Sequence, residues 1–194
     1  MNLVERAKRI LLNPAEEWRV IDGEQATVQG LYTGYIMPLA AIGAIAQVVG
    51  YSVFGMSFMG TTYRTPIGSA VTGAIVTYGL TLVGVYVLAL VIDALAPTFD
   101  GTRNQIQALK VAAYSSTASW VAAVFAVLPG LRILTILGLY SLYLLYLGLP
   151  VLMKAPAEKA MGYTVVVIIA AIVLFMLVGL VAGAVVSPVV GLGA

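Results

Sequence analysis

After a polar beginning, the chain alternates between long apolar stretches and short polar segments. Five stretches lack charged residues: 25–63, 65–92, 111–131, 133–153 and 160–194. About 20 predominantly apolar residues are enough for a helix that crosses the hydrocarbon core of a bilayer. Each stretch therefore has room for one crossing. The pattern predicts membrane-spanning helices near residues 30–56, 66–95, 107–128, 132–153 and 162–186.

Prolines and turn residues support these limits. Pro66 suits the first turn of a helix, whereas three other prolines are expected just beyond helix ends. These are Pro97, Pro129 and Pro188. Asp100-Gly101 is typical of a turn. Residues 55–60 are expected to form a loop, so the first apolar stretch holds one helix rather than two.

The composition agrees with a membrane protein. Of the 194 residues, 61% are apolar and 9% are charged, whereas a soluble domain carries about 25% charged residues. The predicted fold class is all-α: a polytopic membrane protein whose bundle of five transmembrane helices follows a short N-terminal amphipathic helix.

The chain contains no cysteine and no histidine. Their absence excludes disulfides, thiolate nucleophiles, histidine bases and most transition-metal sites. The net charge is only +2, and the positive residues are dispersed. We therefore expect no cofactor, no metal site and no nucleic-acid partner.

The chain divides into an interfacial N-terminal segment, residues 1–29, and a five-helix transmembrane domain, residues 30–194. The first ten or so residues place their apolar side chains on one helical face. These side chains are Leu3, Ala7, Ile10 and Leu11. Asn13-Pro14 starts a second helix, on which Trp18 suits the headgroup level. The segment either senses lipid or docks a partner, or it covers the cytoplasmic end of the bundle as a lid.

The distribution of positive charge predicts the orientation. Five crossings put the ends of the chain on opposite sides of the membrane. Eight Lys and Arg residues fall on the side of the N-terminus, and only Arg64 and Arg132 fall on the other. By the positive-inside rule, the N-terminus is expected in the cytoplasm and the C-terminus outside.

Polar residues within the predicted spans define a candidate intramembrane polar site. The third helix carries hydroxyls on every face, so we expect it to lie at the centre of the bundle. On the fourth helix, three tyrosines spaced three residues apart cover an arc of about 120°. They lie near the middle of a charge-free run and are expected to point into the bundle or a cavity. The candidate residues are Tyr114, Ser115, Thr117, Tyr140, Tyr143 and Tyr146.

This site has two interpretations. It forms a polar groove, or its hydroxyls form ordinary hydrogen bonds between helices, each worth about 0.6 kcal/mol in a membrane. A second group, Asp93, Asp100, Arg103 and Lys110, is expected as a charge cluster on the cytoplasmic side. It either fastens the hairpin between the second and third helices or gates a pathway or binds a lipid headgroup. No pair of carboxylates lies at membrane depth, so no catalytic residue is proposed.

Several motifs resemble the bacterial branch of the Yip family, the "Ypt-interacting protein one" domain. They are NPAEEWRVI, LYTGYIMPLAAI, APTFDGTRNQIQALKVAAYSSTASWVA and LGLYSLYLLYLGLPVLMKAPAEKAMGYTVVV, and the resemblance covers about residues 3–180. It implies a five-span membrane domain with a cytoplasmic N-terminus. The family pattern has a proline where this chain has Ala118, which leaves open whether the third helix is kinked there.

Eukaryotic members of the family are linked to Rab-type small GTPases, vesicle traffic and membrane shaping. They have long cytoplasmic N-terminal regions, whereas this chain has only about thirty residues before the first predicted span.

These observations lead to an expected function. The chain is expected to be a non-enzymatic protein of a bacterial inner membrane that organises the membrane or binds a partner, including a membrane protein or a second copy of itself. The alternative is a small transporter or channel whose polar path is lined by Tyr114, Tyr140 and Tyr143. A membrane-embedded enzyme is the least favoured class, because no nucleophile–base pair is visible.

Overall fold

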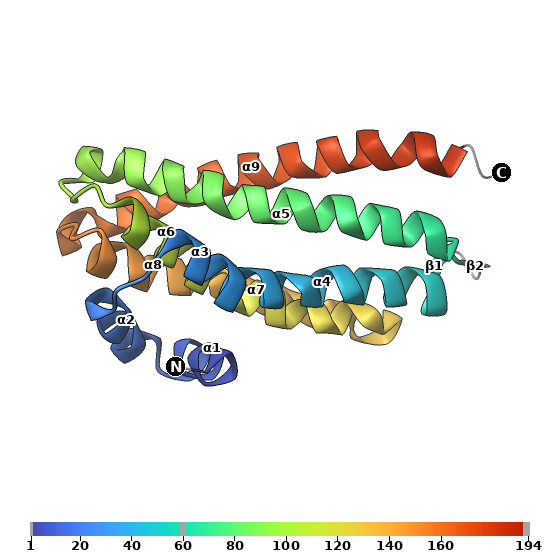
Figure 1. Ribbon diagram of the computed structural model, residues 1–194, viewed down its shortest axis with the longest axis horizontal. Helices are drawn as coiled ribbons and strands as arrows, with labels where there is room; N and C mark the ends of the chain where they lie inside the picture. Colours follow the sequence, from blue (N-terminus) through green and yellow to red (C-terminus); the bar gives the residue numbers. More distant parts are fainter. Residues whose placement is uncertain (1, 59–60, 192–194) are drawn as a thin grey trace.

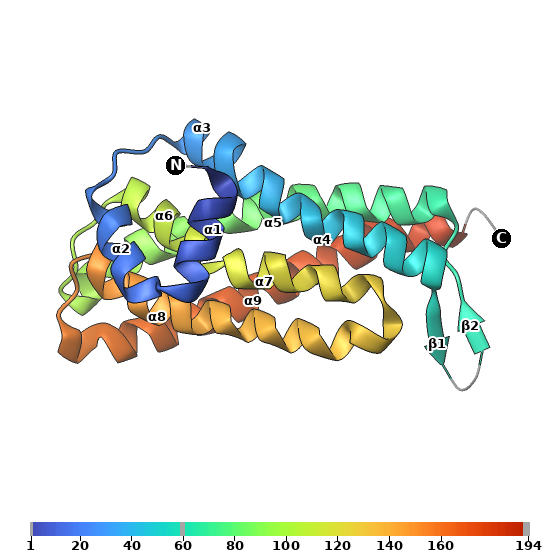
Figure 2. The same cartoon turned by 90° about the horizontal axis from the view of Figure 1, so that it is seen from below.

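The computed structural model describes residues 2–58 and 61–191. Its long helices run side by side along one axis, and both views of the ribbon show an elongated bundle (Figures 1 and 2). Two short N-terminal helices, α1 (Leu3–Leu12) and α2 (Pro14–Gly23), lie at one end of the bundle. We call these two helices the N-terminal cap and this end the capped end. The opposite end carries the hairpin of β1 (Met56–Phe58) and β2 (Thr61–Tyr63) and is called the hairpin end.

Both helices of the N-terminal cap form where the sequence predicts them. The Asn2 side chain accepts a hydrogen bond from the Val4 N–H at 3.1 Å and so caps α1. Pro14 stands at the first position of α2, where no hydrogen bond from its nitrogen is needed. Ala7 and Ile10 are buried beneath α1, and Trp18 and Ile21 are buried beneath α2. The cap is therefore packed against the bundle rather than detached from it.

The first span is one continuous helical segment, Val28–Phe54. It consists of α3 (Val28–Leu31), the π-helix η1 (Tyr32–Ile36), α4 (Met37–Val49) and the π-helix η2 (Gly50–Phe54). Pro38 has no N–H to donate, and the helix widens into a π-helix just before it. At Gly55 a φ of 76° ends the helix. The strands follow in the region expected to be a loop, so the all-α prediction holds apart from this short hairpin.

The second and last spans pack along each other. After Pro66, α5 (Ile67–Leu95) runs the length of the bundle and is followed by the 3-10 helix η3 (Ala96–Phe99). Pro97 lies in η3, just beyond the end of α5, as predicted. The last helix, α9 (Ala157–Gly191), lies beside α5 over much of its length (Figure 1). It continues beyond Pro188, so the prediction that this proline follows the helix end is wrong.

The third predicted helix is broken. A turn at Ser116 separates α6 (Gln105–Ser115) from α7 (Thr117–Ala122), and the 3-10 helix η4 (Ala123–Val127) follows. The chain then returns through the 3-10 helix η5 (Pro129–Leu139) and α8 (Tyr140–Leu152). Four helical segments among the described residues are long and apolar enough to span a membrane, so the prediction of five uninterrupted spans is wrong by one. They are Val28–Phe54, Ile67–Phe99, Pro129–Leu152 and Ala157–Ala184.

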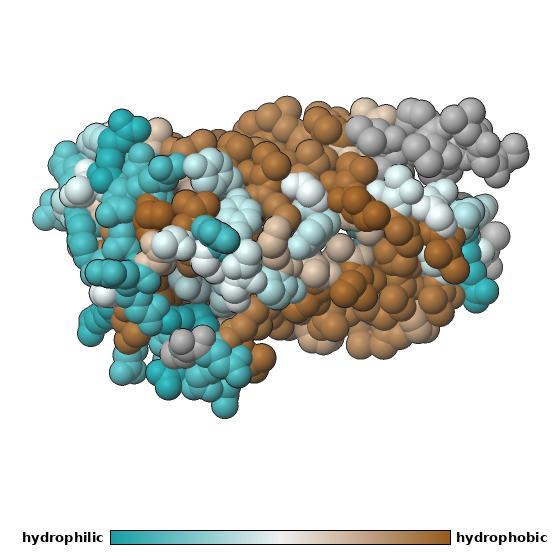
Figure 3. Space-filling model, viewed as in Figure 1, coloured by the Kyte–Doolittle hydropathy of each residue, from teal (hydrophilic) through white to brown (hydrophobic). Residues whose placement is uncertain are grey.

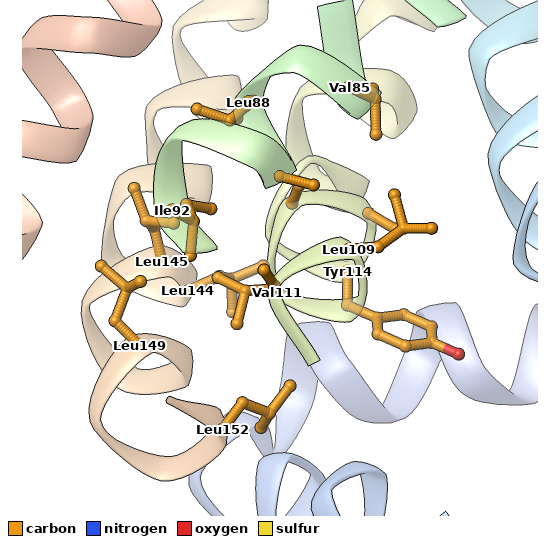
Figure 4. Close-up of a cluster of buried hydrophobic side chains, with 14 of the residues drawn as sticks. Val85, Leu88, Ile92, Leu109, Val111, Tyr114, Leu144, Leu145, Leu149 and Leu152 are labelled. Atoms are coloured by element: carbon orange, nitrogen blue, oxygen red, sulfur yellow. The ribbon is translucent and has the colours of Figure 1, made fainter. Parts of the chain in front are cut away.

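The hydrophobic core lies between α5, α6 and α8. Figure 4 shows its side chains converging from these three helices, among them Ile92, Val111 and Leu144. Residues 108–115 of α6 are all buried, which confirms that this segment is central. The outer surface carries a broad apolar band, whereas polar residues gather at the capped end (Figure 3). Such a band suits contact with lipid.

Candidate functional site

A buried cluster of charges joins the two helices of the cap. The guanidinium of Arg6 donates to the Glu17 carboxylate at 2.5 Å and also binds Glu24. Arg6 is 5% exposed and Glu17 is 3% exposed, so neither charge is solvated by bulk water. Burial lowers the pKa of Arg6, but the hydrogen bond to Glu24 and the charge of Glu17 outweigh it and raise the pKa above its ordinary value. Arg6 is therefore charged at any physiological pH and is paired internally.

Beneath this cluster lies a group of aromatic rings. The ring of Tyr114 packs edge-on against Tyr35, with centroids 4.6 Å apart, and against Trp18 at 6.3 Å. The Arg6 guanidinium carbon lies 5.6 Å from the centroid of the Tyr114 ring, which is a cation–π distance. The Tyr35 hydroxyl is 2.7 Å from the Thr117 hydroxyl, and Thr117 is fully buried. Tyr114 and Thr117 thus belong to the packing between cap and bundle.

The cap is also tied to α6 and to the end of α8. Lys110 is 2% exposed and donates to two backbone carbonyls at the C-terminal end of α2: Ile21 O at 2.9 Å, and Glu24 O. A cation at the C-terminal end of a helix is stabilised by the exposed carbonyls and the helix dipole. Lys154 pairs with Asp22 at 2.5 Å. These contacts place the N-terminal segment as a lid on the capped end.

The predicted charge cluster is divided among three places. Asp93 pairs with Arg103 at 3.2 Å, which confirms a salt bridge across the turn between α5 and α6. Asp100 instead binds Lys159 at the start of α9. Lys110 binds the cap, so it does not help to fasten the hairpin between the second and third predicted helices. The reason is that the carbonyls at the end of α2 reach Lys110 from a segment almost ninety residues earlier in the chain.

The three tyrosines of α8 do not share one environment. The Tyr140 hydroxyl donates to the backbone carbonyl of Leu11 at 3.1 Å, so this residue is a further contact to the cap. Tyr143 is 48% exposed and Tyr146 is 37% exposed. The prediction that all three point into the bundle or a cavity is wrong for Tyr143, because α8 uses its opposite face, with Leu144 and Leu145, to pack against the core. Tyr146 lines a cavity of about 260 Å³ between α2, α8 and the start of α9.

The hydroxyls of the third segment bond locally. Ser115 and Ser116 donate to the carbonyl of Ala112 at 3.4 and 2.8 Å, and Thr117 donates to that of Tyr114 at 2.7 Å. Such back-bonding satisfies a hydroxyl without a partner from another helix. Ser119, in contrast, contacts the fourth segment through the Ser141 hydroxyl at 2.9 Å and the Gly138 carbonyl at 3.0 Å.

A cavity of about 820 Å³ lies between α5, the broken third segment, η5, α8 and α9. Its polar lining comes from α5, both sides of the break, η5 and the start of α8: Thr81, Ser115, Ser116, Ser119, Arg132, Thr135 and Ser141. Its volume is in the range of sites that hold small molecules. The lining includes Ser115 but none of the predicted tyrosines, Tyr114, Tyr140, Tyr143 or Tyr146. The structure therefore separates the candidate polar site into a packed aromatic cluster and a cavity on the far side of the third segment.

Three residues central to this arrangement were not predicted as site residues. Arg6 was counted only among the eight positive charges on the side of the N-terminus, and Glu17 was given no role. Arg132 was counted only as one of the two positive charges on the other side. A signal was present for Arg132, since it is the only charge between residues 111 and 153. An ionisable residue within such a stretch marks a functional site by default. No comparable local signal distinguishes Arg6 from Arg9.

The long apolar helices, the apolar band and the polar cap define an α-helical polytopic membrane protein. Comparison with known proteins gives the family. The family model of the Yip1 domain matches residues 8–180. The chain therefore belongs to the Yip1 domain family, which confirms the resemblance found from its motifs.

Two curated relatives are similar over part of the chain. Both are named "Inner membrane protein YohC", from Escherichia coli strain K12 and from Escherichia coli O6:H1 strain CFT073. Each is 27% identical over 118 residues, which cover 60% of this chain and 60% of the relative. The chain thus matches about three fifths of the length of these relatives. No solved structure matches this chain.

Proposed function

We propose that this Yip1-family protein is a non-enzymatic component of a bacterial inner membrane that binds a protein partner through the outer face of its N-terminal cap. The cap would face the cytoplasm, as the distribution of positive charge predicts. Membrane organisation follows from such binding when the partner is another membrane protein or a second copy of this chain.

One observation carries the proposal: the cap is fixed to the bundle from beneath, while its outer face is left open. Arg6, Trp18 and Ile21 point inward and are buried. Lys8, Glu16 and Arg19 are exposed, and no ion pair among the described residues includes them. A segment held this firmly presents a preorganised surface, which lowers the entropic cost of binding.

The outer face also has a recess. A cavity of about 360 Å³ lies between α1 and α2, lined by Glu5, Lys8, Arg9, Leu12, Glu16 and Val20 among others. Leu12 is 66% exposed and Val20 is 43% exposed. Apolar side chains surrounded by charges of both signs are the arrangement expected of a protein-binding surface.

The acidic residues near the interior support a structural rather than a catalytic role. Glu17 is bound by Arg6, Asp22 by Lys154 and Asp93 by Arg103. An acid–base pair would need a carboxylate positioned toward a substrate, whereas these carboxylates point toward cations of the same chain.

The transport path along Tyr114, Tyr140 and Tyr143 is less well supported. Tyr114 is packed between aromatic rings, and Tyr143 lies on the outer surface together with Leu177. A water-filled path predicts that a cysteine at Tyr143 reacts with a small water-soluble thiol reagent, whereas one at Leu177 does not. We expect neither to react in intact membranes.

The cap proposal is tested by a photoreactive side chain placed at Leu12, inside the recess, or at Val4, outside it. The two residues are on the same helix and are both 66% exposed. We expect one discrete adduct from Leu12, none from Val4, and loss of the adduct when Lys8→Glu and Arg9→Glu are added. An adduct of twice the mass of the chain would identify self-association. Equal adducts from both positions, or none from Leu12, would refute the cap as the binding surface.

A further inference from the structure

Arg132 occupies an unusual position near the hairpin end of the bundle. It belongs to η5 and lines the cavity of about 820 Å³ as well as a second cavity of about 420 Å³ between α4, η4 and η5. The second cavity is lined also by Gln47, Tyr51 and Thr135. A single guanidinium therefore faces two hollow regions within the part of the protein that spans the membrane.

The charge of Arg132 has no acidic partner among the described residues. Its Nη2 donates to the carbonyl of Gly55 at 3.2 Å and its Nε lies 3.5 Å from that of Ala126. The guanidinium carbon is 5.6 Å from the centroid of the Tyr51 ring. These groups are neutral, so the positive charge is held in place but not compensated.

The distribution of acidic residues explains why no carboxylate reaches it. All eight lie at residues 5–24, at 93 and 100, and at 158. These positions belong to the cap and to the turns at the capped end. The hairpin end carries Arg64 and Arg132 and no acidic residue. An uncompensated arginine in a membrane is costly and is expected to attract an anion.

The cavity beside Arg132 opens sideways toward the lipid. Several of its lining residues are apolar and largely exposed on the outer surface: Ile133, Ile136, Leu139, Leu142 and Phe175. Leu145 is buried at its inner wall. In a membrane this rim faces acyl chains rather than water, so a ligand can enter from the bilayer.

We propose that this cavity binds an anionic phospholipid, whose phosphate pairs with Arg132 and whose acyl chain lies along the apolar wall. A guanidinium offers two parallel N–H groups that match phosphate oxygens, and basic pockets between membrane helices are suited to lipid headgroups. The headgroup supplies the missing negative charge, and the chain fills apolar space. This site is separate from the cap, so either proposal can fail without the other.

The protein contains its own probe for this site. Trp120 lines the cavity, and the only other tryptophan is Trp18 in the cap. The full chain is reconstituted in phosphatidylcholine nanodiscs that contain increasing fractions of phosphatidylglycerol with brominated acyl chains, which quench tryptophan on contact. Subtracting the signal of a Trp120→Phe variant isolates the quenching of Trp120. We expect this quenching to saturate at a low mole fraction, and brominated phosphatidylcholine to need a fraction about tenfold higher.

Two pairs of variants locate the site. Arg132→Gln is expected to raise the half-saturating fraction about tenfold. Arg64→Gln removes the same charge from an exposed position at the same end and is expected to change nothing. Ala171→Phe fills the cavity and is expected to reduce the saturating signal, whereas Ile172→Phe places the same phenyl ring on the outer surface beside it and is expected to leave the signal unchanged. The second pair keeps the test valid should Arg132→Gln fail to fold.

Four outcomes would overturn the proposal. Quenching in proportion to the bulk fraction would mean that no site exists. Equal behaviour of Arg132→Gln and Arg64→Gln would remove the role of Arg132. Displacement of the lipid by inorganic phosphate would define a simple anion site. A lipid-independent disulfide between two chains with Ile133→Cys would mean that a second copy covers the groove.

Discussion

At the scale of single residues, the contact between Gly148 and Trp18 determines how closely the cap packs against α8. A Cβ at position 148 would lie 2.7–2.9 Å from three atoms of the Trp18 indole. The indole is fully buried, so it has no free space into which to move. Glycine within a helix normally costs about 0.5–1 kcal/mol relative to alanine. Here that cost is offset because α8 and α2 can approach each other closely.

Gly148→Ala is therefore expected to loosen the cap. Overpacking a buried contact costs about 1–3 kcal/mol, so the open state of the cap should become at least about fivefold more populated. The measurement is the rate at which a thiol reagent labels an Ala7→Cys variant, since Ala7 is 8% exposed and the chain has no native cysteine. Gly79→Ala is the control, because no atom lies within 4 Å of its added Cβ. Equal labelling rates in both variants would contradict the packing argument.

Arg6 and Arg9 provide a second comparison at this scale. Arg6 is buried between two carboxylates, whereas Arg9 pairs with Glu5 on the surface at 2.9 Å. Removing one partner of a buried pair costs about 3–5 kcal/mol, but an exposed pair contributes only about 0–1 kcal/mol. We expect proteases to cut the Arg6→Gln variant faster at Arg19, because its cap opens. In the Arg9→Gln variant the rate of cleavage at Arg19 is expected to stay unchanged. A protected cap in Arg6→Gln would show that the aromatic contacts alone hold it.

At the scale of elements, the break in the third segment determines which groups face the interior. With the turn at Ser116, α7 begins a new first turn, whose N–H groups have no acceptor within the helix. The Ser119 N–H is satisfied by the Ser141 hydroxyl at 3.0 Å. The carbonyl of Tyr114 accepts from the Thr117 hydroxyl. Side chains thus replace the backbone hydrogen bonds that an uninterrupted helix would make.

This break predicts where a proline is tolerated. Ala118 lies in the first turn of α7, so Ala118→Pro is expected to change the thermal unfolding temperature little. Ala113 lies within α6 and is fully buried, and Ala113→Pro is expected to cost about 3 kcal/mol or more. Thermal unfolding in detergent of the two purified variants makes the comparison. Equal destabilisation would mean that the third segment is one continuous helix.

At the scale of the whole molecule, charge is distributed unequally between the two ends of the bundle. The capped end holds every acidic residue and eight of the ten basic ones, whereas the hairpin end holds Arg64 and Arg132. The apolar band separates these ends (Figure 3). Such an imbalance is the feature from which the orientation in the membrane is predicted.

Cysteine labelling in intact cells tests the orientation. Arg64 and Arg19 are both exposed and lie at opposite ends. A membrane-impermeant thiol reagent is expected to label Arg64→Cys in intact cells and Arg19→Cys only after the membrane is permeabilised. The reverse order would place the cap outside and would refute a cytoplasmic partner.

Three features of this protein follow from its amino-acid sequence alone: which segments are apolar, about where most helices begin and end, and how charge is divided between the ends. These properties are local, because the hydropathy of a segment and the hydrogen bond of a helix-capping residue such as Asn2 depend on neighbouring residues only. The bounds of α5 were predicted for this reason, whereas α9 begins earlier and ends later than the predicted helix 162–186. The break at Ser116 was not, since the bonds that stabilise it come in part from Ser141 on another segment.

The contacts between distant side chains depend on how the helices pack and do not follow from local sequence. Lys110 binds Ile21 across 89 residues, and Tyr140 binds Leu11 across 129. Tyr143 faces outward and Tyr146 lines a cavity against α2, although both were predicted to share one environment with Tyr140. The cavity beside Arg132 likewise arises from three parts of the chain that are distant in sequence, residues 81–88, 115–145 and 171–175. A polar residue in an apolar run has several partners available, and the packing of whole helices selects among them.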